Sequence, residues 1–202
     1  LPAPPALDTA SYESQLAAAA AQAGHNLNAA SLDLAAGTVL VHGNVQLAKY
    51  GSITGPGILV ASGNIEIQKN ATIGNGVTLI AGGNVTIHKD SIVGADVLVF
   101  AGGNLSIKKG SSANGSLLAL SNVHLEDATV TGLVYAEGNV ELKERTTVIG
   151  SIVAFGEIDV DGEAVITGEC TALPAPLPAG WNTGTLPVAN DEPFVKATNA
   201  IL

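Results

Sequence analysis

Apolar and polar residues alternate in short segments that recur every 17 to 20 residues along most of the chain. A Gly-Asn or Ser-Asn pair precedes each segment, and the apolar residues then take every second position, as in Val45/Leu47 and Ile65/Ile67. Cutting after each Asn gives successive units of 20, 20, 20, 18, 17 and 18 residues. A period of two is typical of a strand that buries one face. Self-similarity at a fixed period is typical of a repeat architecture.

Each unit holds two further short segments. In the second, one hydroxyl residue precedes one apolar residue, and the hydroxyls form a column: Ser52, Thr72, Ser91, Ser112, Thr129 and Thr147. The third ends in an alanine column: Ala61, Ala81, Ala101, Ala119, Ala136 and Ala154. Three strands per unit with glycine at the corners predict an all-β fold, a right-handed parallel β-helix (β-solenoid) of about seven triangular coils.

The repeat divides the chain into three parts. Residues 1–26 are expected to form an extended lead and a helix that lies on the solenoid side or caps its first coil. Residues 27–170 form the solenoid, and 171–202 are a Pro-rich tail packed on the solenoid or on a neighbour. Asp8 or Ser11 is predicted to cap the helix. Its apolar side is Tyr12, Leu16, Ala19, Ala20 and Ala23.

The third segment of each unit points apolar residues outward as well as inward. Because side chains alternate along a strand, burying the alanine column turns the residue before each alanine away from the core. These residues form an outward stripe: Val60, Ile80, Phe100, Leu118, Tyr135 and Val153. A continuous apolar stripe is expected to be covered, either by the chain's own helix or tail or by a partner. We therefore treat it as a candidate interaction surface.

An asparagine recurs at one corner of every unit. The column is Asn44, Asn64, Asn84, Asn104, Asn122 and Asn139. Stacked amides that hydrogen-bond from one coil to the next stabilise such corners, and the preceding glycine suits a tight turn. The column is therefore predicted to be a structural ladder rather than a ligand site.

Charge is distributed unevenly along the chain. A basic column of Lys49, Lys69, Lys89 and Lys109 is followed by Asp127 and Glu144 in the same position of later units. Stacked lysines either remain solvated or contact an acidic partner. The acidic segment 126–169 of another copy is one such partner, and it would favour head-to-tail association.

Composition excludes several classes of function. The net charge is −10, from 8 basic and 18 acidic residues, so a nucleic-acid partner is not expected. The single Cys170 excludes a disulfide framework and a Cys-based zinc site. No uninterrupted apolar stretch is long enough to cross a membrane. Because the sequence contains no Met, we expect a processed or trimmed chain.

No residue pattern indicates an enzyme, a metal site or a cofactor. The four histidines, His25, His42, His88 and His124, fall at different positions of their units. Glu141 and Asp159 stack in one column, and stacked acids could serve as the acid and base of a carbohydrate-cleaving β-helix. However, Lys143 stacks between Glu126 and Asp161, which is typical of a charge ladder, and no long insertions build a groove. A non-enzymatic role is predicted, with carbohydrate binding or cleavage as the alternative.

The repeats resemble those of bactofilins, β-helical bacterial proteins that polymerise in the cytoplasm. The likeness covers about residues 43–168, for example Gly138-Asn-Val-Glu-Leu. They are equally similar to the β-helical region of surface proteins associated with bacterial type IV pili, in the Pro4-Pro5 lead and in coils such as Gly57-Ile-Leu-Val-Ala-Ser-Gly-Asn64. These resemblances imply a structural subunit or scaffold of a cell-surface filament or pilus-associated assembly, with other protein subunits as partners. A cytoplasmic bactofilin-type polymer is the second implied role.

Overall fold

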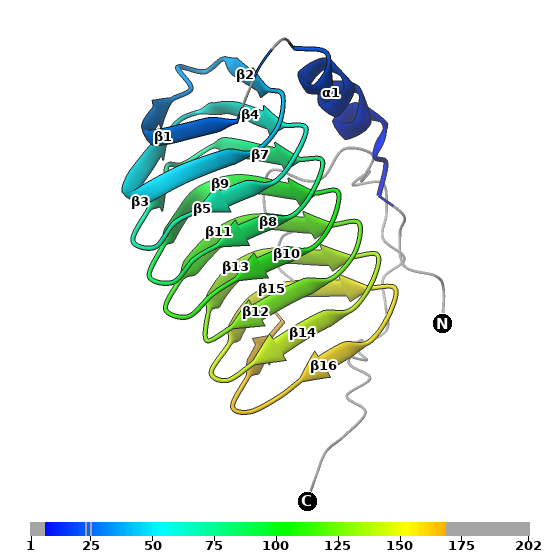
Figure 1. Ribbon diagram of the computed structural model, residues 1–202. Coiled ribbons are helices and arrows are strands. Elements are labelled where there is room, and N and C mark those ends of the chain that lie inside the picture. Colours follow the sequence, from blue (N-terminus) through cyan, green and yellow to red (C-terminus); the bar gives the residue numbers. More distant parts are fainter. Residues whose placement is uncertain (1–6, 23, 25, 169–202) are drawn as a thin grey trace, which may run out of the picture.

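The chain is a parallel β-solenoid. The computed structural model describes residues 7–22, 24 and 26–168, and these form one helix and 17 strands that pair in parallel (Figure 1). The solenoid has about eight turns. The predicted fold class is confirmed, with about eight turns where about seven were expected.

The turns contribute strands to three faces, except that the last described turn contributes to faces 1 and 2 alone. Face 1 consists of the first part of β1 (Leu27–Asp33), the first part of β3 (Val45–Thr54), β5 (Ile65–Ile67), β8 (Val85–Ile87), β10 (Leu105–Ile107), β12 (Val123–Glu126), β14 (Val140–Lys143) and β16 (Ile158–Val160). Face 2 consists of the remainder of β1 and β3, then β6 (Thr72–Ile73) and the first parts of β9 (Ile92–Ala101), β11 (Ser112–Ala119), β13 (Thr129–Ala136) and β15 (Thr147–Ala154), and β17 (Val165–Thr167). Face 3 consists of β2 (Thr38–Val41), β4 (Gly57–Ala61), β7 (Val77–Ala81) and the remainder of β9, β11, β13 and β15. We number the turns 1 to 8 by their face 1 strands, from β1 to β16.

The core inside the solenoid follows the period-two pattern. The paired residues Val45 and Leu47 of turn 2 stack on Ile65 and Ile67 of turn 3, and all four are buried. On face 3 the predicted alanine column also points inward, and it belongs to the same apolar cluster up to Ala154, which is partly buried. Alternation along each strand therefore fixes which side chains fill the solenoid.

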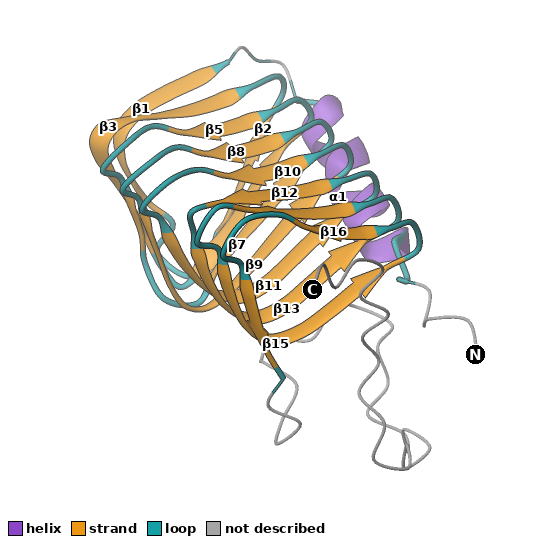
Figure 2. Ribbon diagram, turned by 90° about the horizontal axis from the view of Figure 1, so that it is seen from below, coloured by secondary structure: helices purple, strands orange, loops and turns teal. Residues whose placement is uncertain are grey.

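The one described helix, α1 (Ala10–Ala20), lies along face 3 rather than across the end of the rod (Figure 2). It contacts β4, β2 and β7. The Tyr12 ring stacks on the Phe100 ring with 4.3 Å between their centroids. Asp8, one of the two residues predicted to cap the helix, accepts the Ala10 N–H with its Oδ1 at 3.1 Å. The capping position itself is Thr9. A side helix, not an end cap, is what the structure shows.

The predicted hydroxyl column was wrong at one position. Ile92 pairs with Thr72 and with Ser112, so Ile92 occupies the outward column and is 55% exposed. Ser91 is buried at the corner, where its hydroxyl donates to the Gln68 carbonyl at 3.1 Å. The two-residue pattern Ser-Ile matched its neighbours by residue type, but the strand register is one residue later.

Candidate functional site

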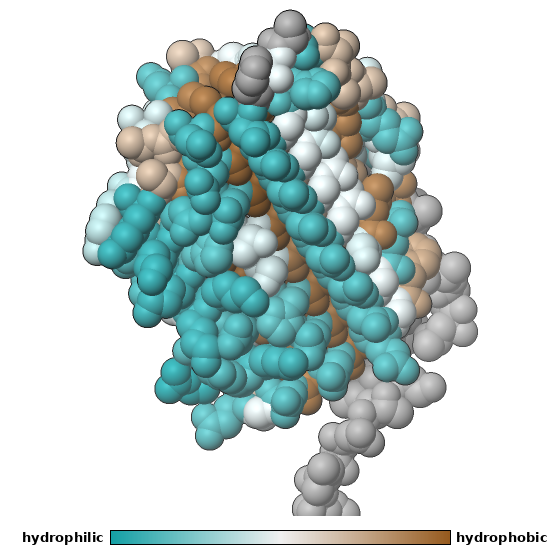
Figure 3. Space-filling view, viewed as in Figure 1, coloured by the Kyte–Doolittle hydropathy of each residue, from teal (hydrophilic) through white to brown (hydrophobic). Residues whose placement is uncertain are grey.

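The outer side of face 1 carries a column of polar side chains. It is predominantly hydrophilic in the view of Figure 3. Strand pairing places one outward residue of each turn in register: Gln46, Glu66, Thr86, Ser106, His124, Glu141 and Asp159. The predicted stacking of Glu141 on Asp159 is thus seen in the structure. This column of polar side chains is the candidate functional site.

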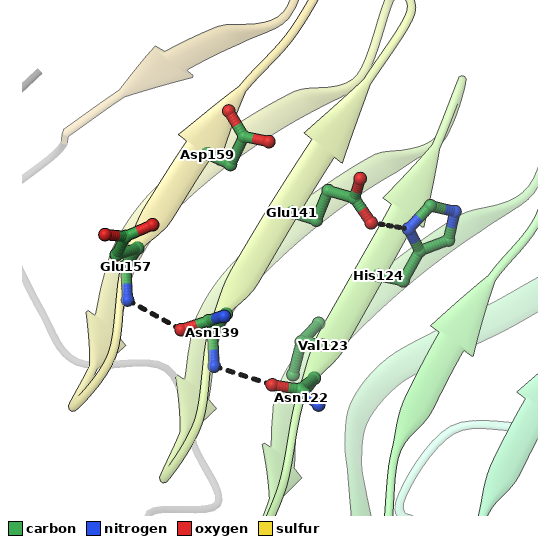
Figure 4. A pocket seen from close by; sticks show the side chains of 7 residues that line it. All are labelled: Asn122, Val123, His124, Asn139, Glu141, Glu157 and Asp159. Atoms are coloured by element: carbon green, nitrogen blue, oxygen red, sulfur yellow. Dashed lines mark hydrogen bonds and ion pairs between the residues drawn. The ribbon is translucent and has the colours of Figure 1, made fainter. Parts of the chain in front are cut away.

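His124, Glu141 and Lys143 form the tightest polar cluster on this face. His124 Nδ1 lies 2.6 Å from one oxygen of Glu141 (Figure 4). Lys143 Nζ donates to the other oxygen at 2.5 Å. The hydrogen bond from Lys143 lowers the pKa of Glu141; partial burial opposes this, and His124 lowers the pKa further. Glu141 also raises the pKa of Lys143. Glu141 is therefore held as a carboxylate, which is the wrong state for a general acid at neutral pH.

The surroundings of this cluster form an open depression of about 370 Å³. Its lining is Asn122, Val123, His124, Asn139, Glu141, Glu157 and Asp159 (Figure 4). These seven described residues include no Phe, Tyr or Trp on which a sugar ring could stack. The depression also runs over adjacent turns without an inserted loop on either side. Its geometry favours a ladder of paired charges over a substrate groove.

The lysines of the basic column form ion pairs at one end of the column and not, among the described residues, at the other. Lys109 forms ion pairs with Glu126, at 3.4 Å, and with Glu144 of the turn beyond. The hydrogen bond from Lys109 to Glu144 raises the lysine pKa. In contrast, Lys49 and Lys69 have no ion-pair partner among the described residues. Lys49 Nζ instead lies 4.6 Å from the centre of the Tyr50 ring.

The asparagine column forms a hydrogen-bonded ladder. Each Asn Oδ1 accepts the backbone N–H of the Asn one turn further along, at 2.7–3.1 Å. The ladder begins with the side chain of Asn26 and ends where Asn139 accepts the N–H of Glu157 at 2.8 Å (Figure 4). The bonds use backbone donors that the strand pairing leaves free at the corner. The geometry supports the predicted structural role.

The ladder makes a testable prediction at Asn64. Its Oδ1 accepts the Asn84 N–H at 2.7 Å. Replacing Asn64 by Ala removes this acceptor, and we expect the free energy of unfolding in urea to fall by about 1 kcal/mol. The Asn64→Asp variant keeps an accepting oxygen and should lose less. If the two variants are equally destabilised, the acceptor is not what matters.

The outward apolar stripe is covered within the chain. Val60, Ile80, Phe100, Leu118 and Tyr135 are fully buried, and Val153 is partly buried. They form a second apolar cluster together with Leu7, Tyr12, Leu16 and Ala19. The stripe therefore points away from the solenoid core as expected, but its first five residues are not available to a partner in this structure.

Two other kinds of site, a metal site and a membrane-spanning helix, are absent from the described part of the chain. There, no group of three or more His, Cys, Asp or Glu side chains is arranged to hold a metal ion. Over those same residues, no helix is both long and apolar enough to cross a membrane. Cys170 and the predicted tail 171–202 lie outside the described residues.

Comparisons with known protein families, with curated proteins and with solved structures give no match to this chain.

Sequence reasoning missed five exposed large apolar side chains: Tyr50, Ile92, Phe155, Val160 and Val165. Tyr50, Ile92 and Val165 are 70%, 55% and 51% exposed. Ile92 and Val165 occupy the outward column of face 2, and Tyr50 lies at the corner between faces 1 and 2. In the sequence, Ile92 and Val165 could have been found as apolar residues that interrupt the hydroxyl column of face 2. The interruption is visible only when the strands are aligned in their correct register.

Proposed function

We propose that this chain is a non-enzymatic structural subunit, a rigid β-solenoid that assembles with other protein subunits in a bacterial cell-surface filament or pilus-associated structure. The surface location is supported by the resemblance of its lead and coils to pilus-associated proteins. The mechanical role is supported by the fold itself. A stack of turns joined by backbone and side-chain ladders resists bending better than a single sheet would.

The observation that carries the proposal is the unpaired strand edge at each end of the described rod. Within the described residues, β1 pairs only with β3, β16 only with β14, and β17 only with β15. Val160 and Val165 at the last turn are 45% and 51% exposed. Strand edges of this kind are templates for pairing with another chain. Each end leaves one edge of a face 1 strand unpaired among the described residues, so we expect the last turn of one copy to pair with the first turn of the next.

The charge distribution supports a polar, head-to-tail direction. Residues 27–109 carry five lysines against four acids, whereas residues 110–168 carry nine acids against Lys143 and Arg145. Two acidic ends repel one another, whereas an acidic end is repelled less by the lysine-containing end of another copy. The association should therefore weaken when salt screens these charges.

The test is the mass of the chain by light scattering over a range of concentrations, at low and at high salt. Head-to-tail assembly predicts a mass that grows without a limit as concentration rises and that falls at high salt. Ile158→Pro is the informative variant. In the preceding turn the equivalent N–H, that of Val140, donates to the carbonyl of the following turn at 2.9 Å. Proline at 158 removes such an outward donor and no donor within the described rod.

A constant monomer mass at every concentration would reject self-assembly and leave only a different partner protein. An Ile158→Pro variant that assembles like the parent chain would show that the strand edge of the last turn is not the contact. Far-UV circular dichroism of both proteins controls for the fold.

A further inference from the structure

We propose that the corner between faces 1 and 2 is a lateral docking surface for a second copy of this chain, with the two rods antiparallel. This contact is separate from the end-on assembly proposed above and does not require it. The partner is identified by charge complementarity along the rod and by exposed apolar side chains on the same surface.

The charged residues of the corner follow a simple order along the rod. The second position after the last inward residue of each face 1 strand is Lys49, Lys69, Lys89, Lys109, Asp127, Glu144 and Gly162 in turns 2 to 8. In the last turn, Asp161 and Glu163 flank Gly162, and both are exposed. The corner is thus basic at one end and acidic at the other.

The middle of this corner is neutralised within the chain. Lys109 is paired with Glu126 and Glu144, and the guanidinium of Arg145 donates to Asp127 at 2.9 and 3.1 Å. The hydrogen bond from Arg145 lowers the pKa of Asp127, which keeps that pair ionised. The turns near the centre therefore present little net charge to a neighbour.

The two ends of the corner keep their charges. Among the described residues, neither Lys49 and Lys69 at one end nor Asp161 and Glu163 at the other forms an ion pair. A parallel neighbour in register would place like charges together at both ends. An antiparallel neighbour centred on turn 5 places turn 2 opposite turn 8 and turn 3 opposite turn 7. Lys49 then faces Asp161 and Glu163. Lys69 faces Glu144, an exposed acid that Lys109 of its own chain also contacts.

Exposed apolar side chains follow the same arrangement. Tyr50 belongs to turn 2 and Val165 to turn 8, so the antiparallel alignment brings them to the same end of the contact. Ile92 of turn 4 lies next to the centre. A contact of this type is isologous: every interaction occurs twice, and the assembly closes as a dimer.

The size of the surface predicts a weak contact. Six strand spacings of about 4.8 Å separate turns 2 and 8, so the contact is about 29 Å long and only one face wide. Exposed ion pairs contribute little each and are screened by salt. We therefore expect a dimer that forms at high protein concentration and dissociates at high salt.

Cysteine cross-linking tests the arrangement directly. In a Cys170→Ser background, Ser112→Cys places an exposed thiol in turn 5, beside its own symmetry mate. We expect a disulfide-linked dimer after mild oxidation at low salt. The matched control is Thr72→Cys, an exposed residue of the same column in turn 3. Its symmetry mate is four spacings away, about 19 Å, which is too far for a disulfide.

Charge reversal supplies the second measurement. In the Ser112→Cys protein, Lys49→Glu with Lys69→Glu should reduce the cross-linked fraction at least tenfold, because four contacts per dimer become repulsive. Asp161→Lys with Glu163→Lys should do the same. Mixing the two variants restores opposite charges between turns 2 and 8 at both ends of the dimer and should raise the cross-linked fraction above that of either variant alone. Circular dichroism checks that each variant is folded.

The outcomes separate the two proposals. Ile158→Pro blocks end-on assembly and should leave the Ser112→Cys dimer intact. The docking proposal is overturned if Ser112→Cys cross-links no better than Thr72→Cys. It is also overturned if the two charge-reversed proteins fail to cross-link when mixed, which would assign the lysines to a different partner or to solvent.

Discussion

Replacing Phe100 by Ala is expected to lower the free energy of unfolding by about 3–5 kcal/mol. Phe100 is fully buried on the outer side of face 3. The Tyr12 ring stacks on it at 4.3 Å and 15° between the ring planes. Because the side chain fills the layer between solenoid and helix, truncation leaves a cavity and removes the main anchor of α1. Urea unfolding measures the loss, and hydrogen exchange of the α1 amides shows whether the helix detaches before the solenoid unfolds.

Phe155→Ala is the matched control. Phe155 is also an aromatic residue on this side of the rod, where its ring meets that of Tyr135 edge-on at 5.9 Å. It is 47% exposed, so its truncation should cost far less. Similar losses for the two variants would show that the Tyr12 stack does not hold the helix. Unchanged exchange of the α1 amides in Phe100→Ala would lead to the same conclusion.

Gly132→Ala is expected to cost about 3 kcal/mol or more, because the corner between faces 2 and 3 has no room for a side chain. Gly132 pairs with Gly115 and Gly150 in the neighbouring turns. Its φ is +139°, and an added Cβ would lie 2.0 Å from the Gly115 carbonyl oxygen. The backbone of one turn would have to move away from the next, which disturbs the ladder on both sides. The midpoint of thermal or urea unfolding measures the effect.

Gly168→Ala tests whether the effect is local crowding rather than loss of glycine as such. A Cβ at Gly168 meets no atom of the described residues within 4 Å. We expect a change within about 0.5 kcal/mol. A mild effect of Gly132→Ala would mean that adjacent turns can separate at this corner, in conflict with the packing described here.

Most of the fold was predictable because the repeat is strict. The inward positions of face 1 and the alanine column of face 3 follow from period two alone, and both are confirmed in the core. The corner at Ser91 was not predictable in the same way. Residue types give the period of a strand but not the number of residues in the corner before it, so a one-residue slip placed Ile92 on the wrong side.

The candidate site was predictable only as columns of residues. The sequence places Glu141 above Asp159 and Lys143 beside Glu126, and strand pairing shows these neighbours. It does not say which charges meet. Lys109 extends across a turn to Glu144, and His124 and Lys143 share Glu141. Such choices depend on side-chain rotamers and on corner geometry, which only the folded structure decides.

The sequence by itself determines that this chain is a stack of turns, because three short strands recur every 17 to 20 residues with glycine at the corners, a pattern typical of a β-solenoid. It also determines where the asparagine ladder runs and that the charges are polarised along the rod. The tertiary structure decided what covers the outward stripe, since a helix of small residues can pack on several apolar surfaces and only contact selects one. Tyr12 stacked on Phe100 fixes that choice on face 3 and leaves the corner between faces 1 and 2 exposed to solvent.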